Sequence, residues 1–299
     1  MRNVFFDRFK KIIREDDSIF FLTGDTGYNL VETVLTEVPE RAINVGVAEQ
    51  NMIGIASGLA HVGFIPVCYA ITNFLIERCF EQIRNDICLH GYKAILVGTS
   101  TGFDNGALGA THHKLDDIGA VKALPNLRIY SPSGIKSMSI ILEEALEAEH
   151  ASFIRISKGN YEEDGEISDP NHYIYKNASP VLVISHGKMI TNSIAAFNEA
   201  PEFSLFAMDR IKPLDDKVLK NLMLKYQYIF VIEDNFNSGL FNSICQWSVE
   251  NQCIPKGLFS ISPDEGYDEF LGDSNFLEDK HGLSPQKIAE QISTFQSKL

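Results

Sequence analysis

The sequence predicts an α/β protein with two doubly wound domains, each built on a parallel sheet. Short apolar or β-branched segments recur along the 299 residues, and segments with the period of amphipathic helices lie between them. Strands that alternate with helices of this length form right-handed βαβ units, which place helices on both faces of a parallel sheet. The chain is also long enough for two domains of ordinary size.

The predicted elements follow one another in this alternating order. Strands are expected at residues 19–22, 65–69, 94–97, 127–130 and 153–156, and then at 181–184, 204–208, 228–232 and 258–261. Amphipathic helices are expected at residues 73–89, 134–149, 215–225 and 285–295. The polar, acidic and turn-rich stretch 159–179 separates the two groups of strands. We therefore predict one domain at residues 1–165 and a second at 178–299.

Composition excludes several classes of function. The formal net charge is −14, and no cluster of Lys and Arg offsets it locally, which argues against nucleic-acid binding. The five cysteines form no C-x-x-C pair, a pattern typical of reduced thiols in a cytosolic protein. The sequence contains neither a signal-peptide pattern nor a run of 18 apolar residues, so we expect a soluble, cytoplasmic protein without membrane contact.

Residues 44–60, NVGVAEQNMIGIASGLA, predict the end of a strand, a turn at Gly46 and a helix rich in small residues. Small residues at this density usually indicate close helix packing. An acidic residue in the first turn of a helix, such as Glu49, is favoured by the helix dipole alone. Taken by itself, this segment does not predict a function.

Several further motifs occur in a fixed order along the chain. They are TGDTG (23–27), FEQIRND (80–86), GATHH (109–113), LPNLRIYSPSG (124–134), FIRISKGN (153–160), the HG within 185–188, IKPLD (211–215), VIEDN (231–235) and HGL (281–283). Together with residues 44–60, they resemble the pyrimidine-binding and C-terminal domains of the transketolase family over essentially the whole chain. The GDG…N motif, with which a full-length member holds the cofactor diphosphate and Mg²⁺, does not occur.

The resemblance implies a thiamine-diphosphate site in which this chain supplies one wall. Glu49 matches the acid that faces N1′ of the aminopyrimidine and moves a proton there. Phe74 matches the aromatic residue that stacks on this ring. Ile71 and Glu77 depart from the usual aromatic and from the usual small residue or Tyr beside it. Asp25 matches an acid near the cofactor, although an Asx turn after a strand explains it equally well.

The resemblance also implies a donor site. His112 matches the histidine that reaches the reactive hydroxyl and carbonyl oxygen of the donor, and His113 replaces the usual Gln. Ser100 and Leu108 stand where a second His and an Asp are usual. Lys158 stands where an Arg usually holds a sugar phosphate, and Lys lacks the bidentate fork of Arg. These departures argue against the ordinary pentose-phosphate substrates.

The function implied is transfer of a two-carbon ketol or related acyl-anion unit between sugars or small aldehydes. A separate diphosphate-binding subunit, in an α₂β₂ assembly, is expected to hold most of the cofactor and the Mg²⁺, with no metal ligand from this chain. Three alternatives stay open. They are the β subunit of a 2-oxo acid dehydrogenase first component, a deoxyxylulose-phosphate synthase, which is normally one long chain, and a non-catalytic regulatory subunit.

Overall fold

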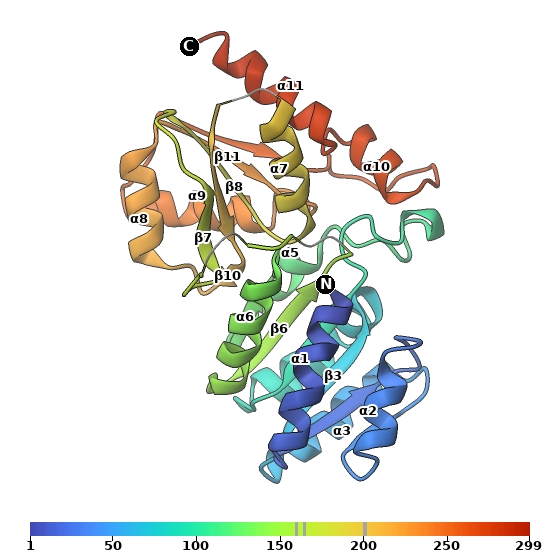
Figure 1. Ribbon diagram of the computed structural model, residues 1–299. Helices are drawn as coiled ribbons and strands as arrows, with labels where there is room; N and C mark the ends of the chain where they lie inside the picture. The colour runs from blue at the N-terminus through green and yellow to red at the C-terminus, as the bar shows by residue number, and fades with distance from the viewer. Residues whose placement is uncertain (159–160, 164–165, 200–201) are drawn as a thin grey trace.

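The protein is described by a computed structural model that covers residues 1–158, 161–163, 166–199 and 202–299. Within these ranges the chain forms two sheets, with helices on both faces of each (Figure 1). The first sheet has the strand order β10-β5-β6-β4-β3-β1-β2, and the second has the order β12-β11-β8-β9-β7. The predicted α/β class with two domains is therefore confirmed.

The first sheet carries the N-terminal strands. They are β1 (Ile19–Thr23), β2 (Ala42–Asn44), β3 (Ile65–Ile71), β4 (Ile95–Thr99), β5 (Leu127–Tyr130), β6 (Ala151–Ile156) and the later β10 (Arg210–Lys212). Alternate strand residues face opposite sides, as the two-residue period of a strand requires. Phe21 and Val67 pack with α1 (Arg2–Glu15), α2 (Val31–Glu37) and α6 (Ile135–Glu147). Leu22 and Cys68 pack with α3 (Glu49–His61) and with residues 75–88 on the other face.

The second sheet consists of β7 (Asn171–Tyr175), β8 (Val181–Ser185), β9 (Ser204–Met208), β11 (Tyr228–Ile232) and β12 (Gly257–Ile261). One face packs on α7 (Lys188–Glu199) and α11 (Pro285–Gln296), near α10 (Ser274–Lys280). The other packs on α8 (Asp216–Lys225) and α9 (Leu240–Glu250) and shares one apolar cluster with the first sheet. The two sheets are thus joined by a continuous core.

Two sequence predictions need correction. Both sheets are mixed, because β10 runs antiparallel to β5 and β7 runs antiparallel to β9 at the sheet edges. The single helix predicted at 73–89 is also wrong. The chain there forms π-helical turns at Asn73–Glu77 and Ile83–Cys88 on either side of α4 (Phe80–Gln82). Bonds of the i→i+5 type, such as Arg78 N–H to the Asn73 carbonyl at 3.4 Å, replace the regular α-helical pattern.

The division at residues 1–165 and 178–299 stays a prediction. Residues 159–160 and 164–165 of the expected linker lie outside the described residues. Strand β10 lies after that linker in sequence yet pairs with the first sheet.

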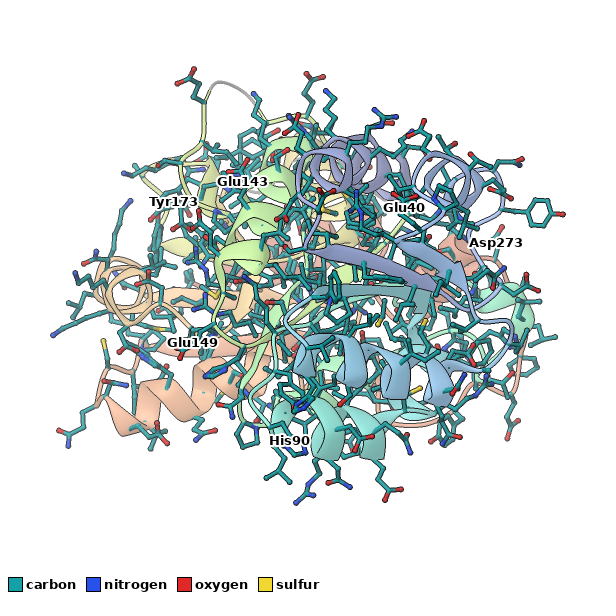
Figure 2. All side chains as sticks on the ribbon, turned by 90° about the horizontal axis from the view of Figure 1, so that it is seen from below. Glu40, His90, Glu143, Glu149, Tyr173 and Asp273 are labelled. Carbon is teal, nitrogen blue, oxygen red and sulfur yellow. The ribbon has the colours of Figure 1, made fainter. Side chains whose placement is uncertain are left out.

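Acidic side chains that contribute to the negative charge point outward, among them Glu40, Glu143 and Glu149 (Figure 2). Within the described ranges, no helix combines the length and apolar character needed to cross a bilayer.

A buried charge network connects the two sheets. Arg155, fully buried on β6, donates from Nε to Asp117 at 2.8 Å and from Nη1 to Asp234 at 2.7 Å. Asn235 donates to the second oxygen of Asp117 at 2.8 Å. Although burial lowers it, the carboxylates of Asp117 and Asp234 raise the pKa of Arg155 above its ordinary value. The guanidinium therefore stays charged and holds the second domain, through Asp234, against the first.

We expect Arg155→Met to lower the free energy of unfolding by about 3–5 kcal/mol, because it leaves two buried carboxylates without their cation. Urea titration followed by circular dichroism measures this loss. Arg8→Met, on the exposed side of α1, serves as the control and should change stability by less than about 0.5 kcal/mol. Equal stability of the two variants would contradict a role of the network in holding the domains.

Candidate active site

The candidate site lies where neighbouring parallel strands of the first sheet end. β1 pairs with β2 and β3, and β3 pairs with β4, so the carboxyl ends of four strands meet at one edge. Segments that follow these strands carry most of the residues predicted from the sequence. Ligands in open α/β sheets bind beside this edge, so the location suits a cofactor.

Glu49 is the first residue of α3 and is only 2% exposed. Gly46, at φ 75°, forms the predicted turn before the helix, in a backbone conformation that favours glycine. Gly24, just after β1, lies so close that a Cβ atom there would be 3.4 Å from Glu49 Cγ. Arg78 donates from Nη1 to Glu49 Oε2 at 2.6 Å. A buried carboxylate at a helix N-terminus is thus paired with one guanidinium.

Phe74 stands beside this ion pair. The guanidinium carbon of Arg78 lies 4.3 Å from the centroid of the Phe74 ring, over its face. The His112 ring meets Phe74 edge-on, with centroids 5.5 Å apart and an interplanar angle of 82°. Three residues predicted from the sequence, Glu49, Phe74 and His112, are therefore brought together, with Arg78 between the first two.

Asn73 explains why His112 lies over Phe74. The Asn73 amide donates to the carbonyls of Thr111 at 3.2 Å and His113 at 3.4 Å, which flank His112. The Thr111 hydroxyl lies 2.9 Å from His112 Nδ1. Sequence reasoning missed Asn73 and Arg78, because their roles depend on contacts with distant segments. The only sequence signal is their position next to Phe74 and the FEQIRND motif.

Glu77 lies on the same segment but turns away from this group. Its carboxylate is paired with Lys114, which also contacts Asp116. Although burial lowers it, hydrogen bonds to Asp116 and Glu77 raise the pKa of Lys114. Ile71 ends β3 half-buried, two residues before Asn73.

The remaining predicted residues are spread around the site. Asp25 is exposed, and its carboxylate and backbone N–H bond to the Asn44 side chain at 3.2 and 3.1 Å. Ser100 follows β4 half-buried with φ 62°, and Leu108 is 58% exposed. Among the described residues, none of these side chains has a hydrogen bond, ion pair or ring contact with Glu49, Phe74 or His112.

His113 and Lys158 lie in surroundings unlike those of His112. His113 is 5% exposed with its ring 5.5 Å from that of Phe103, and burial lowers its pKa. Lys158 contacts the carbonyl of Asp104 through its amine, and its N–H donates to the Asp104 carboxylate at 2.8 Å. Burial raises the pKa of Asp104 to about 6.

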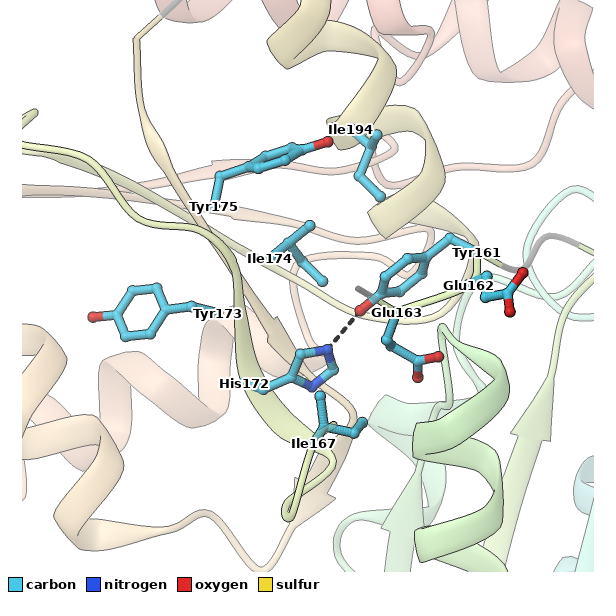
Figure 3. Close-up of a pocket in the computed structure, with 9 residues that line it drawn as sticks. All are labelled: Tyr161, Glu162, Glu163, Ile167, His172, Tyr173, Ile174, Tyr175 and Ile194. Atoms are coloured by element: carbon cyan, nitrogen blue, oxygen red, sulfur yellow. Dashed lines mark hydrogen bonds between the residues drawn. The ribbon is translucent and has the colours of Figure 1, made fainter. Parts of the chain in front are cut away.

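A cavity of about 210 Å³ lies elsewhere, between the linker and the second sheet (Figure 3). The Tyr161 hydroxyl and His172 Nε2 are 2.6 Å apart in its wall. No residue predicted from the sequence lines it, so size alone does not locate the site; the charged group at the strand ends is the stronger candidate.

Comparisons with known proteins place the chain in a family. The family described as "Transketolase, pyrimidine binding domain" matches residues 1–163, more than half of the chain. The chain therefore belongs to the transketolase family. Its identification from the sequence as a transferase subunit of this family, with pyrimidine-binding and C-terminal domains, is confirmed.

Individual relatives fall into two size groups. One of the two subunits of the apulose-4-phosphate transketolase of Actinobacillus succinogenes is 24% identical, with 97% of this chain and 96% of that protein covered. The 6-deoxy-6-sulfo-D-fructose transketolase subunit of a Clostridium species is 24% identical, with coverage of 96% and 92%. The 1-deoxy-D-xylulose-5-phosphate synthase of Natranaerobius thermophilus is 29% identical, but the chain spans only 47% of it.

Solved structures agree on the fold. A split-gene transketolase, described as an inactive β4 tetramer, has a TM-score of 0.82 at 22% identity, with 98% of this chain and 96% of that chain covered. The transketolase of Leishmania mexicana has a TM-score of 0.79 at 16% identity, and 45% of it is covered.

The raised pKa of Asp104 predicts a pH effect on stability. An unfolded aspartate loses its proton near 3.8, whereas folded Asp104 keeps it up to about pH 6. Its stabilising contribution is therefore present below about pH 4 and is lost as the pH rises through about 6. We expect Asp104→Asn, which stays neutral, to raise the free energy of unfolding at pH 7 by about 1–3 kcal/mol. Urea titrations at several pH values measure this, with exposed Asp7→Asn as the control. Lower stability of Asp104→Asn at pH 7 would refute the account.

Proposed function

We propose that this chain is the cofactor-activating subunit of a split, thiamine-diphosphate-dependent transketolase-like enzyme. The observation that carries the proposal is the grouping of a buried carboxylate, an aromatic ring and a histidine, Glu49, Phe74 and His112, at the carboxyl ends of neighbouring strands. The reaction proposed is transfer of a two-carbon ketol or related acyl-anion unit between sugars or small aldehydes.

The residues present fit the aminopyrimidine part of thiamine diphosphate. Arg78 already places a flat, hydrogen-bond-donating group against both side chains, with its Nη1 2.6 Å from Glu49 and its carbon 4.3 Å from the Phe74 centroid. A site that holds a planar guanidinium in this way has the donor–acceptor chemistry and the stacking surface that an aminopyrimidine needs. This similarity supports assignment of the ring to this place.

When bound, thiamine diphosphate supplies a carbon nucleophile for attack on a ketose carbonyl. Glu49 would hold and release a proton at a carboxylate oxygen that faces the ring. Phe74 would orient the ring by stacking. His112 is engaged by Thr111 at Nδ1, which leaves Nε2 as the atom that exchanges a proton with the substrate.

The diphosphate and Mg²⁺ would be held by a separate subunit. The chain matches nearly the full length of two transketolase subunits and less than half of the single-chain synthase. An α₂β₂ assembly with active sites between unlike subunits would complete the site, as closed symmetry favours. In this proposal, Asp25, Ile71 and Glu77 border the cofactor and provide no metal ligand.

The donor is proposed to differ from ordinary pentose phosphates. Ser100, Leu108 and His113 replace polar residues that such donors use, and the Lys158 amine is already engaged by the Asp104 carbonyl. The two relatives of similar length are named for a branched sugar phosphate and a sulfonated sugar, so sugars with an anionic terminus are the class to screen first.

We expect Glu49→Gln to lower turnover by the assembled enzyme about 10²–10⁴-fold, because a carboxamide cannot exchange the proton. The fold should persist, since an amide oxygen can still accept from Arg78. NMR detection of C2–H exchange in bound thiamine diphosphate measures the activating step directly. Glu143→Gln, on the exposed face of α6, is the control. Wild-type exchange rates in Glu49→Gln would end the assignment.

We expect the chain alone to bind thiamine diphosphate weakly and with little dependence on Mg²⁺, because it would supply only one wall of the site. Calorimetry with and without a co-expressed diphosphate-binding subunit tests this. Binding should tighten at least about 100-fold in the complex. Tight, Mg²⁺-dependent binding by the chain alone would contradict the split arrangement, and acyl transfer to a lipoyl carrier would favour the dehydrogenase alternative.

A further inference from the structure

Arg78 occupies the space between the two side chains that would hold the aminopyrimidine. Its guanidinium donates to the carboxylate of Glu49 and covers the face of Phe74 at the same time. Its side chain is 40% exposed, whereas that of Glu49 is 3% exposed. The cation thus reaches inward from the surface and covers a buried acid.

These two contacts are the ones that the cofactor ring would need. A guanidinium is planar, donates N–H groups in its plane and stacks on aromatic faces, as an aminopyrimidine also does. With Arg78 Nη1 2.6 Å from Glu49 Oε2 and Arg78 Cζ 4.3 Å from the Phe74 centroid, a ring cannot take the same place. Arg78 and the ring are therefore mutually exclusive occupants.

We propose that Arg78 closes the aminopyrimidine site of the free subunit and must release Glu49 and Phe74 before thiamine diphosphate binds. The inference rests on the proposed function and adds a self-inhibiting contact to it. Within the described chain, Arg78 is the only cation paired with Glu49. It therefore keeps a buried carboxylate compensated until a ligand replaces it.

The opening movement requires little rearrangement of the fold. Arg78 stands at the break between two π-helical turns, and its guanidinium is partly in contact with solvent already. Rotation of its side chain outward leaves the backbone contacts of Asn73 and Phe74 in place. The closed state lowers the apparent affinity for the cofactor by the fraction of molecules that are open.

The test compares Arg78→Met with wild type in the complex of this chain and its diphosphate-binding partner. Calorimetry with thiamine diphosphate and Mg²⁺ should show binding about 10-fold tighter for Arg78→Met, if about nine-tenths of wild-type sites are closed. The free Arg78→Met chain should melt at a lower temperature, because Glu49 loses its cation. Arg84→Met, an exposed arginine six residues along the same segment, should change neither quantity. Arg78→Lys, which keeps the charge but not the planar fork, should fall between them.

A second measurement tests the contact without the cofactor. In the full wild-type chain, the NMR signal of Arg78 Nε–H should carry a ring-current shift that Phe74→Leu removes. Addition of thiamine diphosphate to the wild-type complex should remove the same shift.

The outcomes separate the two proposals. Unchanged or weaker cofactor binding by Arg78→Met, while wild type binds and Glu49→Gln fails to activate, would overturn the role of Arg78 and leave the proposed function standing. Absence of binding by both wild type and Arg78→Met in the complex would overturn both. A ring-current shift that persists with bound cofactor would also overturn the displacement.

Discussion

The buried guanidinium of Arg155 is the constraint on which the rest of the structure depends. A charge without water must be compensated, so Asp117 and Asp234 have to approach it from opposite sides. Asp234 follows β11 of the second sheet, and Asp117 begins the short helix α5 of the first. One side chain thereby fixes how the two domains meet and where the segment before Asp117 ends.

That segment carries the candidate catalytic histidine, and three polar contacts hold it. Asp117 secures its end through Arg155, Lys114 secures its middle through Glu77, and Asn73 grips the carbonyls on either side of His112. Two of these contacts come from the segment that follows β3 and bears Phe74. The histidine is therefore placed relative to the aromatic ring by the strand edge, and its position does not depend on the loop's own conformational preference.

The sequence predicts what local patterns encode. Apolar runs located the central strands, and the turn at Gly46 followed by Glu49 at a helix start was correct because glycine and helix-dipole preferences are local. The helix predicted at 73–89 failed because the side chain of Asn73 bonds to a loop 38 residues away, which periodicity cannot reveal. The pairing of β10 with β5 and of Arg78 with Glu49 was missed for the same reason. The family resemblance supplied candidates, and only tertiary contacts could group them.

The buried charges differ in one respect that bears on function. Arg155 is fully enclosed, with two carboxylates and no route to water, so its pairing is permanent in the folded state. Arg78 satisfies a carboxylate that is equally buried, but 40% of its own side chain remains exposed. Since the cost of separation depends on what replaces the lost partner, a pair with one solvated member can open when a ligand offers the same contacts. The difference in exposure therefore distinguishes an ion pair that holds the fold from one that can yield to a cofactor.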